Sequence, residues 1–219
     1  MALSECNVII DEAGRELLEH GTLAFPIACY HDDLAAMPVP WHWHEELEAA
    51  IVTEGSAIVT SDSHKYVITA GNGFFINKSV LHAAWNADTS SCRFHSLVFH
   101  PRLVGGSMES VFWQNYINPI QDDPALQSIL LEQQISWQKS ALDAIETAWQ
   151  NCLKEPPGYE FLVRDALSRF IYLLASHKES AETVPSSQDV RYSIRIKQML
   201  QYIQEHCSED LTIRQIALV

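Results

Sequence analysis

Glycine is distributed very unevenly along this chain of 219 residues. Seven of its 8 glycines lie within the first 106 residues, and only Gly158 lies beyond them. Tight turns favour glycine because it adopts positive φ angles without strain. The first half is therefore expected to turn often, and the second half to contain longer, uninterrupted elements.

Short runs rich in β-branched and aromatic residues lie between these glycines, and such runs are typical of β-strands. Strands that follow one another at close spacing indicate a small sandwich or barrel. A barrel is therefore expected over residues 1–106. The seven expected strands are 24–30, 47–53, 56–60, 65–69, 73–77, 80–85 and 93–99.

After residue 106 the apolar residues recur every three or four positions, as they do in helices. A helical region is therefore predicted over residues 107–177. The expected helices are 107–116, 124–135, 137–153 and 160–176. The last two are joined by a segment with two prolines and a glycine, which predicts a tight reversal and an antiparallel pair. The fold class is α+β.

A polar segment at 178–191, rich in Ser, Thr and Glu, has the composition of a linker. It is followed by an amphipathic pattern at 192–206, which predicts a helix. Thr212 is expected to be the N-cap of one more helix, which begins shortly before Val219.

Composition limits the partners of the chain. Its 28 acidic and 14 basic side chains give a formal net charge of -14, which argues against a surface that grips a phosphate backbone. No apolar run approaches the roughly 18–20 residues of a membrane span, and the first residues lack the pattern of a signal peptide. We therefore expect a cytoplasmic protein without a membrane partner. The 5 cysteines lie far apart, without C-x-x-C spacing, and are expected to be buried thiols.

Three histidines and one glutamate form the most specific polar pattern. His42, His44 and Glu48 share one face of an extended strand because side chains alternate with period two, and His82 comes from a later strand. Three imidazoles and a carboxylate suit iron, manganese, nickel or zinc. The alternatives are a divalent transition-metal site and a hydrogen-bonded polar cluster without metal.

A small effector bound at the same place is a third interpretation. Tryptophan side chains would form apolar walls, and imidazoles would be polar anchors, an arrangement that suits a sugar or a small acid. Side chains alternate along the expected strand 93–99, and this alternation allows His95 to face inward too. The alternative is a histidine in the core whose hydrogen bonds are made within the protein. The expected effector-binding residues are Trp43, His44, His82, Trp85 and His95.

The segment from His42 to Gly55, H-x-H-x3-E-x6-G, resembles the first cupin motif in spacing and residue type. GFFINKSVLH at 73–82 is similar to the second motif, but Ser79 and Leu81 stand where the cupin pattern has proline and glycine. The resemblance implies a cupin-like barrel of the jelly-roll type. It also implies a rival function, a metal-dependent dioxygenase or sugar isomerase with the three histidines and Glu48 as metal ligands.

The whole order of parts resembles a transcription regulator of the AraC/XylS family. WHWHEELEAAIVTEGSAIV and GNGFFINKSVLHAAW are similar to the regulatory barrel of that family, and PPGYEFLVRDALSRFIYLL to its dimerisation region. Residues 192–219 are similar to the opening of its helix-turn-helix domain, which we expect to be incomplete here. The resemblance implies a small-molecule effector, a homodimer, and DNA binding through a longer parent protein.

No G-x-S-x-G, phosphate-loop or H-E-x-x-H motif is present, so no catalytic residue is assigned and the chain is not expected to be an enzyme. An apolar stripe on the helix pair is interpreted as the dimer surface, because a stripe without a partner would be an exposed patch. The alternative is that the stripe packs on the barrel of its own chain. The stripe consists of Leu142, Ile145, Trp149, Leu162, Ala166 and Phe170.

Overall fold

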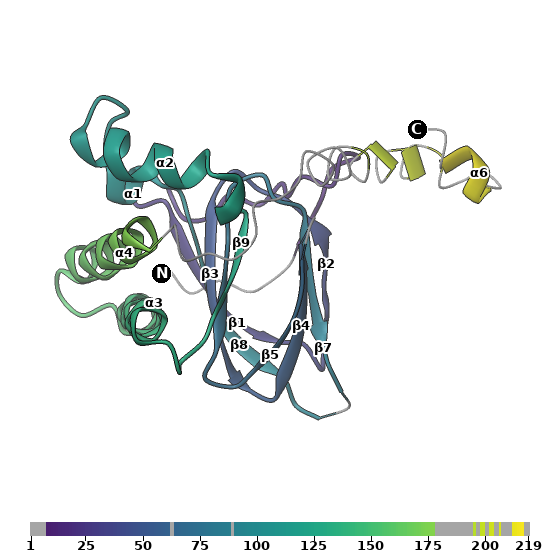
Figure 1. Cartoon of the computed structure of the whole chain (residues 1–219), viewed down its shortest axis with the longest axis horizontal. Helices are drawn as coiled ribbons and strands as arrows, with labels where there is room; N and C mark the ends of the chain where they lie inside the picture. The colour runs from purple at the N-terminus through teal and green to yellow at the C-terminus, as the bar shows by residue number, and fades with distance from the viewer. Residues whose placement is uncertain are drawn as a thin grey trace.

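Two antiparallel β-sheets form the β part of the computed structural model (Figure 1). The first sheet has the strand order β1-β8-β3-β6-β9, and the second has the order β2-β7-β4-β5. The strands are β1 (Ile27–Asp33), β2 (Val39–His42), β3 (Leu47–Glu54), β4 (Ser56–Ser61), β5 (Lys65–Thr69), β6 (Gly73–Ile76), β7 (His82–Asn86), β8 (Arg93–Phe99) and β9 (Ser128–Leu131). The structure describes residues 8–61, 64–88, 90–177, 195, 198–199, 202–203, 206 and 212–216.

All seven expected strands are present, with small shifts of their ends. β2 was not predicted, because Pro40 lacks the N–H group that a strand uses for pairing. β2 lies at the edge of its sheet, where a proline is tolerated. The cupin-like barrel that the sequence predicted is confirmed.

The expected helix at 124–135 is wrong. A short 3-10 turn (Pro124–Leu126) is followed by strand β9, which pairs antiparallel with β6. The hydroxyl of Ser128 in β9 lies 2.8 Å from the hydroxyl of Ser61 in β4, so β9 connects the two sheets. The apolar spacing of this segment fits a helix, but the open edge of β6 offers its backbone hydrogen-bond partners. The region expected to be helical thus contributes a strand to the barrel.

Two long helices, α3 (Ser136–Lys154) and α4 (Tyr159–Ser176), cover the outer face of the first sheet (Figure 1). They agree with the expected helices at 137–153 and 160–176. The helix expected at 107–116 is displaced: a π-helical turn (Trp113–Ile117) and α2 (Asn118–Gln121) follow a short α1 (Arg102–Gly105).

The central strand β3 is buried on both faces, because the barrel interior lies on one side and the helices on the other. Ala50 and Val52 belong to the core inside the barrel, whereas Ala49 and Ile51 belong to the core between sheet and helices. Glu48 lies two positions before Ala50, so both side chains are on the same face of β3 and the Glu48 carboxylate points into the barrel.

The apolar stripe expected at a dimer surface belongs mostly to the core between sheet and helices. The buried members are Leu142, Ile145, Trp149, Ala166 and Phe170. Only Leu162 is exposed, at 47%. The assignment to a dimer surface is therefore wrong for five of the six residues. The outer face of the first sheet is itself apolar, and the stripe covers it within the same chain.

Near the end of the chain, α6 (Ile213–Ile216) has Thr212 as its N-cap, as expected. The Thr212 hydroxyl accepts a hydrogen bond from the Gln215 backbone N–H, and the Gln215 side chain accepts one from the Thr212 N–H. This reciprocal pair is a capping box. The expected linker at 178–191 lies outside the described residues, as does most of the expected helix at 192–206.

Cys29, Cys92 and Cys152 are buried free thiols, in agreement with the sequence analysis, and the other two cysteines lie outside the described residues. None of the helices in the described part of the chain has the length and apolar character needed to cross a lipid bilayer.

Candidate functional site

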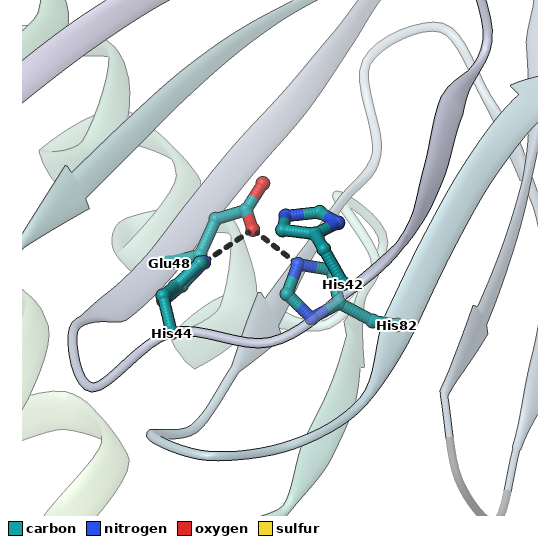
Figure 2. A group of neighbouring side chains, drawn as sticks. All are labelled: His42, His44, Glu48 and His82. Atoms are coloured by element: carbon teal, nitrogen blue, oxygen red, sulfur yellow. Dashed lines mark hydrogen bonds and ion pairs between the residues drawn. The ribbon is translucent and has the colours of Figure 1, made fainter. Parts of the chain in front are cut away.

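The three histidines and Glu48 meet inside the barrel, at the end where β2 finishes and β7 begins. His42 closes β2 and lies opposite His82, the first residue of β7. His44 belongs to the connection that leads into β3, and Glu48 is the second residue of β3. Figure 2 shows the four side chains pointing toward one another, and one ligand atom from each lies within 4.8 Å of the others. All four residues are buried.

Each of the three imidazoles is oriented by a backbone carbonyl two residues away. Nδ1 of His42 lies 2.9 Å from the carbonyl oxygen of Pro40, and Nδ1 of His82 lies 2.8 Å from that of Val80. The corresponding contact of His44 is 3.2 Å. A carbonyl only accepts hydrogen bonds, so Nδ1 carries the proton in each ring. In a neutral imidazole, Nε2 then presents its lone pair to the cluster.

Glu48 holds the centre of the cluster. Its Oε2 lies 2.9 Å from Nε2 of His82 and 3.5 Å from Nε2 of His44 (Figure 2). Nε2 of His44 is buried and has no hydrogen-bond partner among the described residues. A proton or a metal cation is needed between Oε2 and the nearer nitrogen, because two lone pairs at that distance repel each other.

The charges in the cluster depend on one another. Burial, together with the neighbouring His82 and His44, lowers the pKa of His42 to about 2, so this ring is neutral. Burial alone would raise the pKa of Glu48, but the nearby rings of His44 and His82 lower it. Burial lowers the pKa of His82, but the hydrogen bond and the charge of Glu48 outweigh burial and raise it.

These residues fit a transition-metal ion. Two ligand atoms of a tetrahedral zinc site lie about 3.4 Å apart when the metal–ligand bonds are about 2.1 Å long, and the separations here span that value. Hydrogen bonds from Nδ1 to carbonyl groups are the outer contacts that fix the tautomer of metal-binding histidines. The group can therefore hold a divalent ion through three Nε2 atoms and one carboxylate.

A second buried carboxylate reaches the cluster from residues 8–20, which we call the N-terminal hairpin. Oε2 of Glu16 lies 3.8 Å from Nε2 of His42 and 3.1 Å from Nε2 of His20. Nδ1 of His20 in turn lies 2.8 Å from the hydroxyl of Tyr30 in β1. Glu16 and His20 were not predicted as site residues, because nothing in their local pattern indicates that the hairpin packs at the barrel mouth.

The remaining residues of the expected effector site point elsewhere. Trp85 lies opposite Ile58 on the outer face of its sheet and contacts Trp41, with 6.1 Å between ring centroids. Trp43 faces the N-terminal hairpin, where its indole N–H donates a hydrogen bond to the carbonyl oxygen of Ala13. These two tryptophans therefore do not line the barrel interior.

His95 also lies outside the barrel. Its ring stacks on that of Trp149 in α3, with centroids 3.4 Å apart, and its Nδ1 lies 2.9 Å from a carboxylate oxygen of Glu146. His95 shares one face of β8 with Leu97 and Phe99, and that face packs on the helices instead of lining the barrel interior. Of the expected effector-binding residues, the structure brings only His44 and His82 together in the barrel.

The cavity beside the cluster is small. Its volume is about 30 Å³, and Glu16, His20, His42 and Glu48 are among its lining residues. Such a volume holds one or two water molecules. A sugar does not fit there while the N-terminal hairpin occupies this position.

Residues 24–146 match the family described as AraC-like ligand binding domain. Over 214 residues the chain is 28% identical to the uncharacterized HTH-type transcriptional regulator YdeC of Bacillus subtilis, an alignment that covers 96% of this chain and 72% of that protein.

Among solved structures, an RmlC-like cupin with a double-stranded β-helix fold from Methanocaldococcus jannaschii is similar over 35% of this chain and 72% of its own, with 19% identity and a TM-score of 0.32. An RmlC-like cupin from Shewanella frigidimarina is similar over 33% of this chain and 65% of its own, with 22% identity and a TM-score of 0.29.

Proposed function

Since the chain belongs to the family of AraC-like ligand binding domains, we propose that its barrel binds an effector and thereby sets how a transcription regulator engages DNA. The relative from Bacillus subtilis, a transcriptional regulator of the helix-turn-helix type, supports the same role. The observation that carries the proposal is the buried polar cluster inside the matched barrel. A barrel with only a structural role gains nothing from burying three imidazoles and two carboxylates, because such groups cost free energy unless they are paired.

β3 provides the route from the site to the helices. Glu48 faces the cluster, and the next residue, Ala49, faces the core beneath α3 and α4. A change in the position of β3 therefore reaches the helix layer without an intermediate element. An effector shifts the balance between two arrangements only by its differential affinity for them, which is typically about 1–3 kcal/mol.

A homodimer is part of this proposal, with its surface on the exposed side of α4. Phe161 and Tyr172 are 78% and 58% exposed, and both line a groove of about 440 Å³ with Phe112. These two residues lie eleven positions apart, about three helical turns, so they share one face of α4. Two copies of α4 that pack antiparallel about a two-fold axis would place Phe161 of one copy near Tyr172 of the other.

Light scattering at tens of micromolar tests this dimer. We expect a dimer for the unchanged chain and a monomer for Phe161→Glu. Val67→Glu is the matched control, because Val67 is an exposed apolar residue on β5, away from α4. A monomeric unchanged chain contradicts the dimer.

The sensing function is tested with the full chain fused to a DNA-binding domain that acts only as a dimer, with transcription of a reporter as the measurement. A panel of sugars, small acids and divalent metals should contain at least one compound that changes transcription. Glu48→Leu should abolish the response while the fusion remains folded. A folded fusion that responds to no compound on the panel contradicts the proposed function.

One observation favours a second candidate function, a metal-dependent enzyme. The three histidines and Glu48 are a ligand set that leaves coordination positions open for a substrate on a divalent metal. The small cavity argues against this function, since a substrate would first have to displace the N-terminal hairpin. Oxygen uptake by the metal-loaded chain, with small acids as substrates, would favour the enzyme over the sensor.

A further inference from the structure

A groove outside the barrel lies between the segment that leads into β1 and the helix layer. Its walls come from residues 23–26, from α1 and from the first turns of α4, which lies beside α1 (Figure 1). Its volume is about 470 Å³, which suits a small organic molecule. We call it the arginine groove; its lining includes Leu23, Phe25, Arg102, Leu103, Phe161 and Arg164, and none of the four clustered side chains of the barrel.

Large apolar side chains line the arginine groove and remain open to solvent. Leu23, in the segment before β1, is 84% exposed, and Phe161, in the first turn of α4, is exposed as well. Phe25 and Leu103 are half-buried and pack against the core between sheet and helices. Exposed apolar groups that gather around one hollow mark a binding site, whereas scattered ones do not. The groove thus offers a fixed apolar base with two exposed apolar side chains beside it.

Two arginines line the same groove without a carboxylate partner. Nη2 of Arg102 donates a hydrogen bond to the carbonyl oxygen of Leu23, at 3.2 Å, which holds this guanidinium at the groove. Among the residues that the structure describes, no carboxylate oxygen lies within 4.0 Å of a guanidinium nitrogen of Arg102 or Arg164. Arg93, by contrast, lies 3.4 Å from a carboxylate oxygen of Asp33. The guanidinium groups at the groove are therefore available to an anion from outside the chain.

The arginine groove is positively charged although the chain as a whole is strongly acidic. The chain has 28 acidic and 14 basic side chains, whereas Glu160 is the one acidic residue beside two arginines in the described lining of the groove. A guanidinium presents a planar fork of N–H donors that matches a carboxylate. Two such groups next to exposed apolar side chains favour a ligand that combines a carboxylate with an apolar body.

We propose that the arginine groove binds a small organic carboxylate, whose charged end pairs with Arg102 and Arg164 and whose apolar body covers Leu23 and Phe161. This site lies outside the barrel, and it goes beyond the sensing function proposed for the chain and does not depend on it. Phe161 and Arg164 also line the neighbouring groove of about 440 Å³ on α4. A carboxylate in the arginine groove therefore adjoins the surface proposed for the dimer.

Isothermal titration calorimetry with the full chain tests the site. The probes are 2-naphthoate and 2-naphthamide, which share one apolar body and differ in charge. We expect about one equivalent of naphthoate per chain, bound at least about tenfold more tightly than the neutral amide. Arg102→Gln and Arg164→Gln should each weaken naphthoate at least about fivefold and leave the binding of naphthamide unchanged.

The matched control is Arg169→Gln, because Arg169 is an exposed arginine on α4 outside the lining of the groove. This variant should bind naphthoate as the unchanged chain does. Thermal unfolding of each variant shows that it is folded. Nuclear magnetic resonance locates the probe: naphthoate should shift the methyl signals of Leu23 and the ring signals of Phe161.

Four results would overturn the inference. They are no binding of naphthoate at millimolar concentration, equal affinity for the two probes, and arginine variants that bind naphthoate as well as the unchanged chain. The fourth is a naphthoate shift at His82 instead of Leu23, which places the probe in the barrel and leaves the sensing function standing. An affinity that falls as the protein concentration rises identifies a second copy of the chain as the occupant of the groove and likewise refutes the carboxylate.

Discussion

Replacing Phe170 by alanine should destabilise the chain by about 3–5 kcal/mol. Phe170 in α4 is fully buried, and its ring meets that of Phe75 in β6 edge to face, with centroids 5.8 Å apart. Burying a phenylalanine side chain contributes about 1.5–3 kcal/mol. The empty cavity and the lost aromatic contact add about 1–2 kcal/mol. This loss is a large share of the about 5–15 kcal/mol that stabilises an ordinary domain.

Urea denaturation, followed by tryptophan fluorescence at two protein concentrations tenfold apart, measures the effect. A core residue lowers the free energy of unfolding by the same amount at both concentrations, whereas an interface residue makes the loss depend on concentration. Leu162→Ala is the control from the same apolar stripe, and it should cost less than about 1 kcal/mol because Leu162 is half exposed. Phe170→Leu should cost about 1–1.5 kcal/mol, which keeps the comparison usable if the alanine variant does not fold.

Two results would refute this reasoning. One is a loss below about 1 kcal/mol for Phe170→Ala. The other is a loss that disappears at the higher protein concentration, since that behaviour belongs to a residue buried between two chains rather than within one.

Three further predictions concern other parts of the fold. Burial alone would raise the pKa of Glu146, but the hydrogen bond to His95 outweighs burial and lowers this pKa. The contribution of Glu146 to the free energy of unfolding is therefore fully present above its unfolded-state pKa. It is lost as the pH falls through the lower folded-state pKa. Glu146→Gln should cost less than about 1 kcal/mol in urea denaturation at pH 7, since this side chain is more than a third exposed, and the cost should shrink as the pH falls through the folded-state pKa of Glu146. Gly55→Ala should cost more than about 2 kcal/mol of unfolding free energy, because φ is 72 and a Cβ would overlap a neighbouring carbonyl; Gly106→Ala, with φ 68 and open space, should cost about 1 kcal/mol. A hydrogen bond with a neighbouring thiol, together with burial, raises the pKa of Cys152, so a thiol reagent should label it only on unfolding, and rapid labelling of the native chain would contradict its burial.

Local patterns predicted much of this fold. The short runs rich in β-branched and aromatic residues predicted β3, β4 and five other strands, and the helical period predicted α3 and α4. His42, His44 and Glu48 meet as expected, but they lie on β2, the connection and β3 rather than on one extended strand. The strand and helix predictions succeed because side-chain direction within one element follows from the backbone geometry of that element alone.

Local patterns also failed in particular places. β9 was predicted as a helix, because its few apolar residues fit the period of a helix as well as that of a strand. Pairing with the open edge of β6 selects the strand. His95 was placed in the barrel, whereas its face of β8 packs on α3.

Contacts between residues distant in the sequence also explain the buried apolar stripe and the unforeseen approach of Glu16 to His42. Amino-acid patterns show which side chains share a face. They do not show what covers that face, because the cover comes from residues distant in the sequence and is selected by packing of the whole chain.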